Sequence, residues 1–278
     1  MRILIMTAVA VCYLGTLVAQ PQTSTNAAFQ RPIDDVVAST TMQEKRVLPY
    51  APVREADILW KKRIWREIDT REKMNLTFRN PEMPLVKILT DAVLSGELRA
   101  YDAEDDKFSV LMDKENLDER LYKVDSVYIT DPITYEDTLQ IVRNDFDPQD
   151  VKRFRLKEVW YFDANTSTMK VRIIGIAPLV DVYGDNNDYR YSTPLFWIYY
   201  PDARKLLAKQ AVYIPGNDKK VMSWEDILEM RFFTSYITKE SNVMDERLQE
   251  RYSGEELLRE SEKIRQKIFN IEQDMWSN

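Results

Sequence analysis

The chain has 278 residues, with 39 basic and 46 acidic side chains, a net charge of −7, no histidine and one cysteine, Cys12. Without imidazoles or thiols beyond the first 19 residues, the composition excludes Ser-His-Asp and Cys-His nucleophiles and zinc sites with nitrogen or sulfur ligands. The acidic balance argues against nucleic acid or an anionic membrane surface as the main partner.

Residues 1–19 are typical of an export signal. Arg2 precedes an apolar run at 3–18, shorter than the roughly 20 residues that span a bilayer. We expect cleavage between Ala19 and Gln20, although Leu17 stands where a small residue is usual and the cut could shift. Cys12 could instead be the lipid-bearing residue of a lipoprotein, but a large Val11 precedes it and the apolar run continues beyond it. The mature chain would have 259 residues, which is enough for one large domain or two smaller ones. It would carry a net charge of −8 and could form no disulfide.

Residues 20–56 are predicted to form an extended or disordered arm. Prolines 21, 32, 49 and 52 stand among Ser, Thr, Asn and Gln, with few apolar residues in periodic order. Such a composition buries too little surface to offset the entropy of ordering, so the arm alone should be mobile and could dock on a partner as an extended strand.

Residues 57–252 are predicted to form the folded body. Trp60, Ile64 and Ile68 recur every four residues, which predicts an amphipathic helix beginning near Asp57. A second helix is predicted over 84–95, with Gly96 as a left-handed stop. A short strand pair at 98–101 and 107–111 follows.

The rest of the body mixes strands and helices. A strand is predicted at 124–130, and the β-branched and apolar residues over 155–183 predict a hairpin with its turn at 163–167. An aromatic strand at 195–200, a helix at 201–210 and a helix at 223–233 complete the body, the last with capping-box residues Ser223 and Asp226. We therefore predict an α+β fold.

The segment 253–278 is predicted to be an amphipathic helix, opened by Ser253 and Glu256 at capping-box spacing. Its apolar positions are Leu257, Ile264, Ile268, Ile271 and Met275. They follow heptad spacing, but Ser261 interrupts the seam and only about three heptads are present, which favours a packed helix over an autonomous coiled coil. The apolar stripe needs a surface to bury against, and a neighbouring subunit could supply it.

The remaining motifs are more typical of turns than of catalytic or ligand-binding sites. The five glycines beyond residue 19 are too dispersed for a phosphate loop. Ser167 and Lys170 match the spacing of a serine-lysine acyl enzyme, but they lie in the predicted hairpin turn without the accompanying motifs. Aspartates 181, 185 and 188 could bind calcium, although their order suits a turn between strands better. We predict no catalytic, cofactor-binding or metal-binding residue.

The sequence leaves a catalytic pair of carboxylates open, because spacing along the chain does not show which acidic side chains lie close together in the fold. Glu67 and Asp69 form the most concentrated candidate for hydrolase chemistry, and the alternative is a solvated, salt-bridged helix end. The aromatic runs at 160–162 and 196–200 could form a sugar-stacking wall, but aromatic residues in strands are more often core.

Five blocks of residues stand in a characteristic order: RIWREIDTREKMN at 63–75, YPDARKLLA at 200–208, MSWEDIL at 222–228, SYI at 235–237 and DMW at 274–276. In this order they resemble the gliding-motility family GldN, also called PorN. The resemblance covers nearly all of the predicted body.

This resemblance implies a non-enzymatic periplasmic component of the type IX secretion system. Family members assemble with the lipoprotein GldK or PorK, and with copies of themselves, into a ring at the inner face of the outer membrane, so membrane association is indirect. The motor proteins GldL and GldM (PorL and PorM) are further expected partners. The alternative from the residues themselves is a carboxylate-dependent hydrolase or glycan-binding module of the cell envelope.

Overall fold

The computed structural model describes residues 44–130, 137–184, 186, 188–213 and 222–277, with only the backbone described for 123–130, 137–145 and 276–277. The predicted signal peptide, with Cys12, and the arm up to residue 43 lie outside the described residues. Within this part the chain is α+β, as predicted. The α-helices are α1 (Leu85–Leu94), α2 (Lys114–Leu121), α3 (Tyr200–Leu207), α4 (Trp224–Glu229) and α5 (Gly254–Ser277). Short 3-10 helices are η1 (Glu55–Asp57), η2 (Lys73–Arg79), η3 (Pro148–Asp150) and η4 (Leu248–Glu250).

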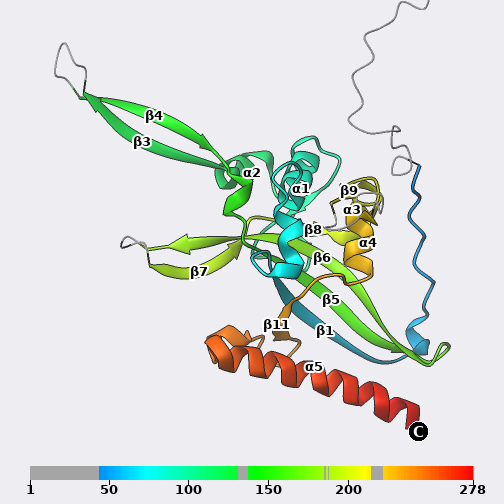
Figure 1. Ribbon diagram of the computed structural model, residues 1–278. Helices are drawn as coiled ribbons and strands as arrows, with labels where there is room; N and C mark the ends of the chain where they lie inside the picture. The colour runs from blue at the N-terminus through cyan, green and yellow to red at the C-terminus, as the bar shows by residue number, and fades with distance from the viewer. Residues whose placement is uncertain (1–43, 131–136, 185, 187, 214–221, 278) are drawn as a thin grey trace, which may run out of the picture. The chain divides into compact units, whose positions relative to one another are not determined.

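The strands form one main sheet and two small ladders (Figure 1). The main sheet has the order β11-β1-β5-β6-β8-β2, with β7 paired to β6, and all of its pairs are antiparallel. Its strands are β1 (Ile58–Asp69), β2 (Ala100–Tyr101), β5 (Arg153–Asp163), β6 (Thr168–Tyr183), β7 (Tyr189–Pro194), β8 (Trp197–Tyr199) and β11 (Tyr236–Glu240). The ladders pair β3 (Tyr122–Thr130) with β4 (Asp137–Asp145) and β9 (Ala211–Val212) with β10 (Met222–Ser223).

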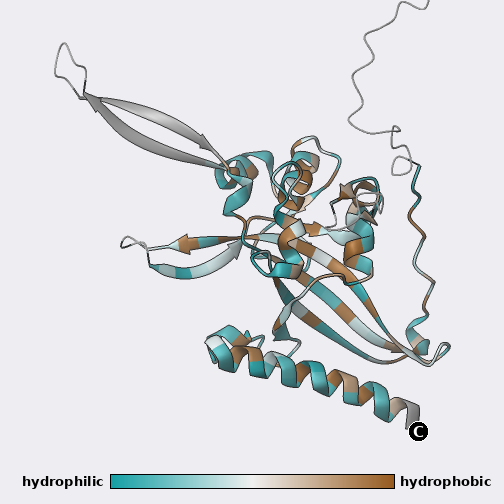
Figure 2. Cartoon of the chain, viewed as in Figure 1, coloured by the Kyte–Doolittle hydropathy of each residue, from teal (hydrophilic) through white to brown (hydrophobic). Residues whose placement is uncertain are grey.

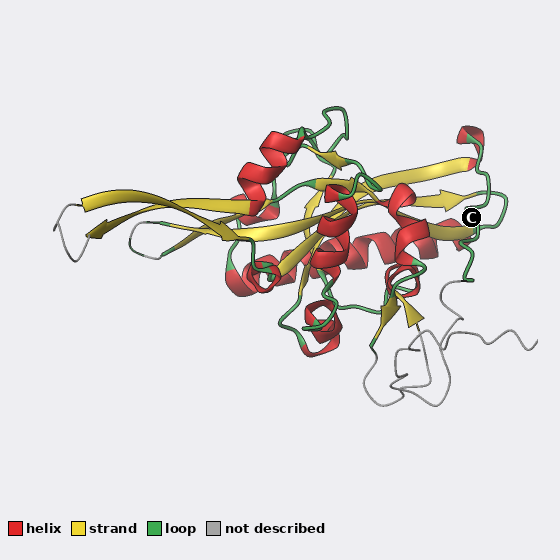
Figure 3. Ribbon diagram, turned by 90° about the horizontal axis from the view of Figure 1, so that it is seen from above, coloured by secondary structure: helices red, strands yellow, loops and turns green. Residues whose placement is uncertain are grey.

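The largest hydrophobic core lies where α1, α3 and α4 pack on one face of the sheet. Ile68, Leu156 and Ile176 come from β1, β5 and β6 and are fully buried. Leu89 of α1 and Trp224 of α4 pack against them. Figure 2 shows where apolar residues recur along these strands and helices, and Figure 3 shows helices lying against the long strands. The loop between β2 and α2 and the loop after β11 lie over part of the opposite face.

The predicted helix near Asp57 is wrong, because residues 58–69 form strand β1 in the middle of the sheet. Trp60, Ile64 and Ile68 lie four residues apart, and four is close to one helical turn but also twice the strand period. The same spacing therefore gives one face in either structure. Pairing with β5 along nearly its whole length, and with β11 on the other side, selects the strand.

The other predicted strands, helices and helix ends are largely confirmed. The predicted hairpin is β5–β6 with its turn at 164–167, and the strand at 124–130 is β3. Helix α1 ends before Gly96, whose φ of 79° is the predicted left-handed stop. The capping box of Ser223 and Asp226 at α4 is formed in both directions. The pair at 98–101 and 107–111 is reduced to β2 and a single bridge from Tyr101 to Leu111.

Helix α5 packs against the main sheet of the same chain. Ile268 is 4% exposed and packs, together with Ile264, against Ile64 of β1 and Ile237 of β11. Ser261, which interrupts the heptad seam, accepts a hydrogen bond at 2.6 Å from the backbone N–H of Ile237 and so satisfies a donor of the edge strand. The chain's own sheet therefore covers the middle of the apolar stripe, whereas Leu257, Ile264, Ile271 and Met275 are half-buried.

Candidate functional site

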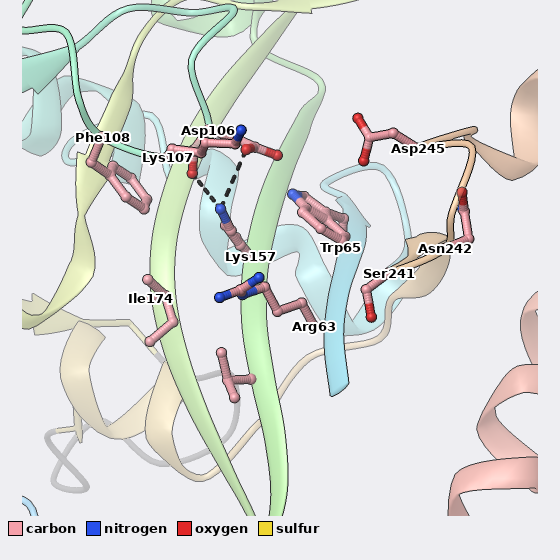
Figure 4. Close-up of a pocket in the computed structure, with 11 residues that line it drawn as sticks. Arg63, Trp65, Asp106, Lys107, Phe108, Lys157, Ile174, Ser241, Asn242 and Asp245 are labelled. Atoms are coloured by element: carbon pink, nitrogen blue, oxygen red, sulfur yellow. Dashed lines mark hydrogen bonds and ion pairs between the residues drawn. The ribbon is translucent and has the colours of Figure 1, made fainter. Parts of the chain in front are cut away.

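A pocket of about 560 Å³ opens on the face of the sheet that the helices leave uncovered (Figure 4). Its floor comes from β1, β5 and β6, and its walls come from the loop between β2 and α2 and from the loop after β11. It is lined by Arg63, Trp65, Asp106, Lys107, Phe108, Lys157, Val159, Ile174, Ser241, Asn242 and Asp245. We call it the sheet pocket.

Three buried side chains from adjacent strands lie side by side at the base of the sheet pocket, and two of them, Trp65 and Lys157, line it. Trp65 of β1 pairs in register with Lys157 of β5 on one side and with Lys239 of β11 on the other. All three residues are at most 7% exposed. The ammonium groups lie 5.4 Å (Lys157) and 4.6 Å (Lys239) from the centroid of the indole ring, which is cation–π range. Burial lowers the pKa of Lys157, and the nearby Asp106 partly offsets this effect.

The wall over Lys157 is shaped by Asp105. Its carboxylate accepts hydrogen bonds from the backbone N–H groups of Lys107, Ser109 and Val110, and these bonds fold the loop tightly. Phe108 then takes a positive φ of 61°, and its ring meets Trp197 and Tyr199 edge-on.

Gly175 of β6 leaves the room that Phe108 occupies. A Cβ at this position would lie 2.4 Å from the tip of the Phe108 ring, so any larger residue would push the loop away. A glycine inside a strand is the one sequence signal that could have pointed to this close approach.

The charges in the sheet pocket are unequally satisfied. Lys157 donates to the carbonyl and carboxylate oxygens of Asp106, as the dashed lines in Figure 4 mark, and Lys239 lies 2.6 Å from the carboxylate of Asp245. Arg63 and Lys107, in contrast, form no ion pair with any other described residue. Both side chains are exposed. The indole N–H of Trp65 is buried without a hydrogen-bond partner among the described residues.

The predicted carboxylate candidate Glu67 lies next to the sheet pocket, in a buried ion network. Its carboxylate is 2.7 Å from Nη2 of Arg155, and it also accepts from the hydroxyl of Tyr236 at 2.9 Å. Glu67 is fully buried and Arg155 is 2% exposed. The expectation of a solvated helix end is therefore wrong, because β1 carries this residue into the sheet. Asp69 instead forms a pair with Arg71 at the partly exposed end of the strand.

The other candidate residues hold turns and strands together. Lys170 pairs with Asp163 across the hairpin at 2.6 Å, and Ser167 lies in the turn. Asp181 pairs with Arg153 and accepts from Ser192, whereas Asp185 lies outside the described residues. No group of three or more acidic side chains in the described part of the chain is arranged to hold a metal ion.

The aromatic runs are mainly core, as predicted. Tyr161 and Phe162 of β5 and Phe196, Trp197 and Tyr200 around β8 are each at most 5% exposed. They therefore leave little ring surface on which a sugar could stack.

The described end of the predicted arm, residues 44–51, lies against α3 and α4. We call this segment the docked arm. Lys45 binds Ser223 and Asp226 of the capping box. Tyr50 lies with its ring centroid 4.0 Å from the guanidinium carbon of Arg204, and its hydroxyl donates to Glu229 at 2.5 Å. The sequence showed no signal for this contact, because its partners lie more than 150 residues away.

No described helix is both long and apolar enough to cross a membrane. Comparison with protein families matches residues 53–277 to the family described as gliding motility associated protein GldN. Comparison with curated proteins finds no match.

Proposed function

Because this chain belongs to the GldN family, which is part of gliding motility and type IX secretion, we propose that it is a non-catalytic structural subunit of the periplasmic ring of that system. The observation that carries the proposal is the family match, which runs from residue 53 to residue 277 and so includes every strand of the main sheet and helix α5.

In this role the chain assembles with the lipoprotein GldK or PorK and with adjacent copies of itself. Its place is the periplasmic side of the outer membrane, reached through the export signal of residues 1–19, and the lipoprotein supplies the membrane attachment. The motor proteins GldL and GldM are further partners. The buried ion network supports a structural role, because the Glu67 carboxylate is occupied by Arg155 and Tyr236.

Helix α5 supplies a surface for assembly. Its inner side is buried on the sheet, but Leu258 and Phe269 are each 53% exposed. Exposed large apolar residues on one helix favour an interface with another protein. The arm over residues 20–56 is the second contact that we propose.

The test is co-expression with the lipoprotein, followed by affinity purification and negative-stain imaging. We expect rings with the native chain and a clear loss of co-purification with Phe269→Glu. Asn270→Asp is the matched control, because it adds the same charge at an exposed position of α5 that lies about 100° round the helix from Phe269. A chain lacking residues 20–43 keeps the docked arm and tests the arm separately.

Two results would contradict the proposal. One is the absence of rings with the native chain and its lipoprotein. The other is hydrolysis of peptidoglycan fragments that Glu67→Gln abolishes while the protein stays folded, which would instead support the cell-envelope hydrolase.

A further inference from the structure

We propose that the sheet pocket is a docking site for an acidic segment of a partner protein. A carboxylate of that segment enters the pocket and binds Arg63 and the indole N–H of Trp65, while a neighbouring apolar residue of the segment rests on Val243 and Met244. The choice of a protein as the source of the carboxylate rests on the proposed assembly role.

The charges of the sheet pocket select an anion. Its two acids, Asp106 and Asp245, already face the ammonium groups of Lys157 and Lys239. Arg63 forms no ion pair among the described residues, whereas Lys107 acts on the charge of Asp245 from beyond ion-pair distance. A ligand that brings a negative charge therefore finds unused donors, whereas a cation would have to displace a lysine from its partner.

The buried indole of Trp65 adds a donor with a fixed direction. Trp65 is 7% exposed and held between Lys157 and Lys239, so the ring has little freedom to turn its N–H toward water. Figure 4 places this ring in the pocket beside the loop that carries Asp106. A buried N–H without a partner costs free energy, which an entering carboxylate oxygen would recover.

The rim of the sheet pocket indicates that the carboxylate belongs to a protein. The loop that supplies Ser241 and Asn242 continues into Val243, which is fully exposed, and Met244, which is 75% exposed. Asn242 also lines a second hollow, of about 330 Å³, together with these two residues. A charged pocket beside exposed apolar side chains fits a peptide in which an acidic residue adjoins an apolar one.

The site is preorganised by hydrogen bonds within the walls. The amide of Asn242 donates to the carbonyl oxygens of Glu240 and Glu246 and accepts from the N–H of Glu246, which closes the loop on itself. The backbone N–H of Ser241 donates to the carbonyl oxygen of Arg63 at 2.9 Å, which joins that loop to β1. Little ordering of this loop is then left to occur on binding, and the one change that binding requires is that the groups over the buried indole N–H of Trp65 move aside.

The test uses a short fluorescein-labelled peptide in which glutamate and leucine alternate between glycine-serine ends, with a glutamine-for-glutamate peptide as the neutral probe. Fluorescence anisotropy with the full mature chain should show binding of the acidic peptide only. Arg63→Glu should weaken binding about tenfold or more, as expected for loss of a charge-assisted hydrogen bond. Lys61→Glu is the matched control, because Lys61 is also an exposed cation of β1 but does not line the pocket, and its effect should be much smaller.

A second measurement reports on Trp65 itself. In an NMR spectrum of the ¹⁵N-labelled chain, the acidic peptide should shift one indole N–H signal, and that signal should be missing in Trp65→Phe. If Trp65→Phe fails to fold, the shift of a single indole signal in the native chain, lost in Arg63→Glu, decides the question.

Three outcomes would overturn the docking site. They are equal binding of the neutral peptide, equal effects of Arg63→Glu and Lys61→Glu, and Arg63-dependent binding of phosphatidylglycerol vesicles without binding of the peptide. The last would assign the pocket to a lipid headgroup. Because ring formation with the lipoprotein is measured separately, rings without peptide binding would remove only this inference, and peptide binding without rings would remove only the proposed function.

Discussion

Replacing Glu67 with alanine should destabilise the fold strongly, because the charge that it removes is buried and paired. Glu67 is fully buried and holds Arg155, itself only 2% exposed, at 2.7 Å. Without the carboxylate, the guanidinium of Arg155 stays buried without its counter-charge. Breaking a buried pair on one side in this way costs about 3–5 kcal/mol.

That cost is a large share of the total, since domains unfold with about 5–15 kcal/mol. For a chain of this size it corresponds to a fall in Tm of roughly 10 °C. Urea denaturation followed by circular dichroism would measure the change in the free energy of unfolding. Arg71→Ala is the control, because its pair with Asp69 is 56% exposed on the arginine side and should contribute less than about 1 kcal/mol.

A double variant, Glu67→Met with Arg155→Met, separates an unpaired charge from lost contacts. Replacing both partners with apolar residues of similar volume removes the buried charges together, so the double variant should be more stable than either single one. The reasoning is refuted if Glu67→Ala costs no more than Arg71→Ala, or if the effects of the two methionine substitutions simply add.

Three further results are expected. Ile268→Ala should lower the free energy of unfolding by about 2–5 kcal/mol in urea denaturation, because it leaves a cavity between α5 and the sheet. Phe269→Ala, at an exposed position, should change the free energy of unfolding by less than about 0.5 kcal/mol, and equal effects of the two variants would contradict this placement of α5. Burial raises the pKa of Tyr200 and Tyr236, so the stability that these phenols contribute is complete below their unfolded pKa near 10 and is lost as the pH rises above it. Denaturation between pH 8 and 11 should show this decline in the free energy of unfolding, and Tyr236→Phe should make the decline smaller. The same pH profile in Tyr236→Phe and the native chain would argue against the buried phenol. Tyr50→Ala should release the docked arm and speed tryptic cleavage there without lowering the stability of the body, and unchanged cleavage would refute the contact with Arg204.

Local sequence patterns were sufficient to predict an element where its hydrophobic period or a residue at its end determines the structure. The β-branched run of β6 and the turn after β5 predict their hairpin, and the left-handed Gly96 and the capping box at Ser223 mark the ends of their helices. These signals work because their physical cause lies within a few residues of the chain. The aromatic residues around β8 were assigned to the core for the same reason.

The site could not be predicted in this way, because its residues come from distant segments. Trp65 appeared as a helical residue, and only its pairing with Lys157 and Lys239 makes it the floor of the sheet pocket. Glu67 appeared as a solvated carboxylate, and only the neighbouring strand shows its partner, Arg155. Strand β11, which supplies Lys239, was not predicted at all.

The sequence by itself determined which chemistry is missing, the α+β class and the family, because composition and ordered blocks of residues carry that information directly. The tertiary structure decided that β1 follows the strand period and not the helix period, and that α5 packs on the chain's own sheet. It also decided which cations of the described segments lack an ion pair there. Spacing along a chain defines a face, but only the segments that come to lie against that face decide whether it is buried, paired or open to a partner.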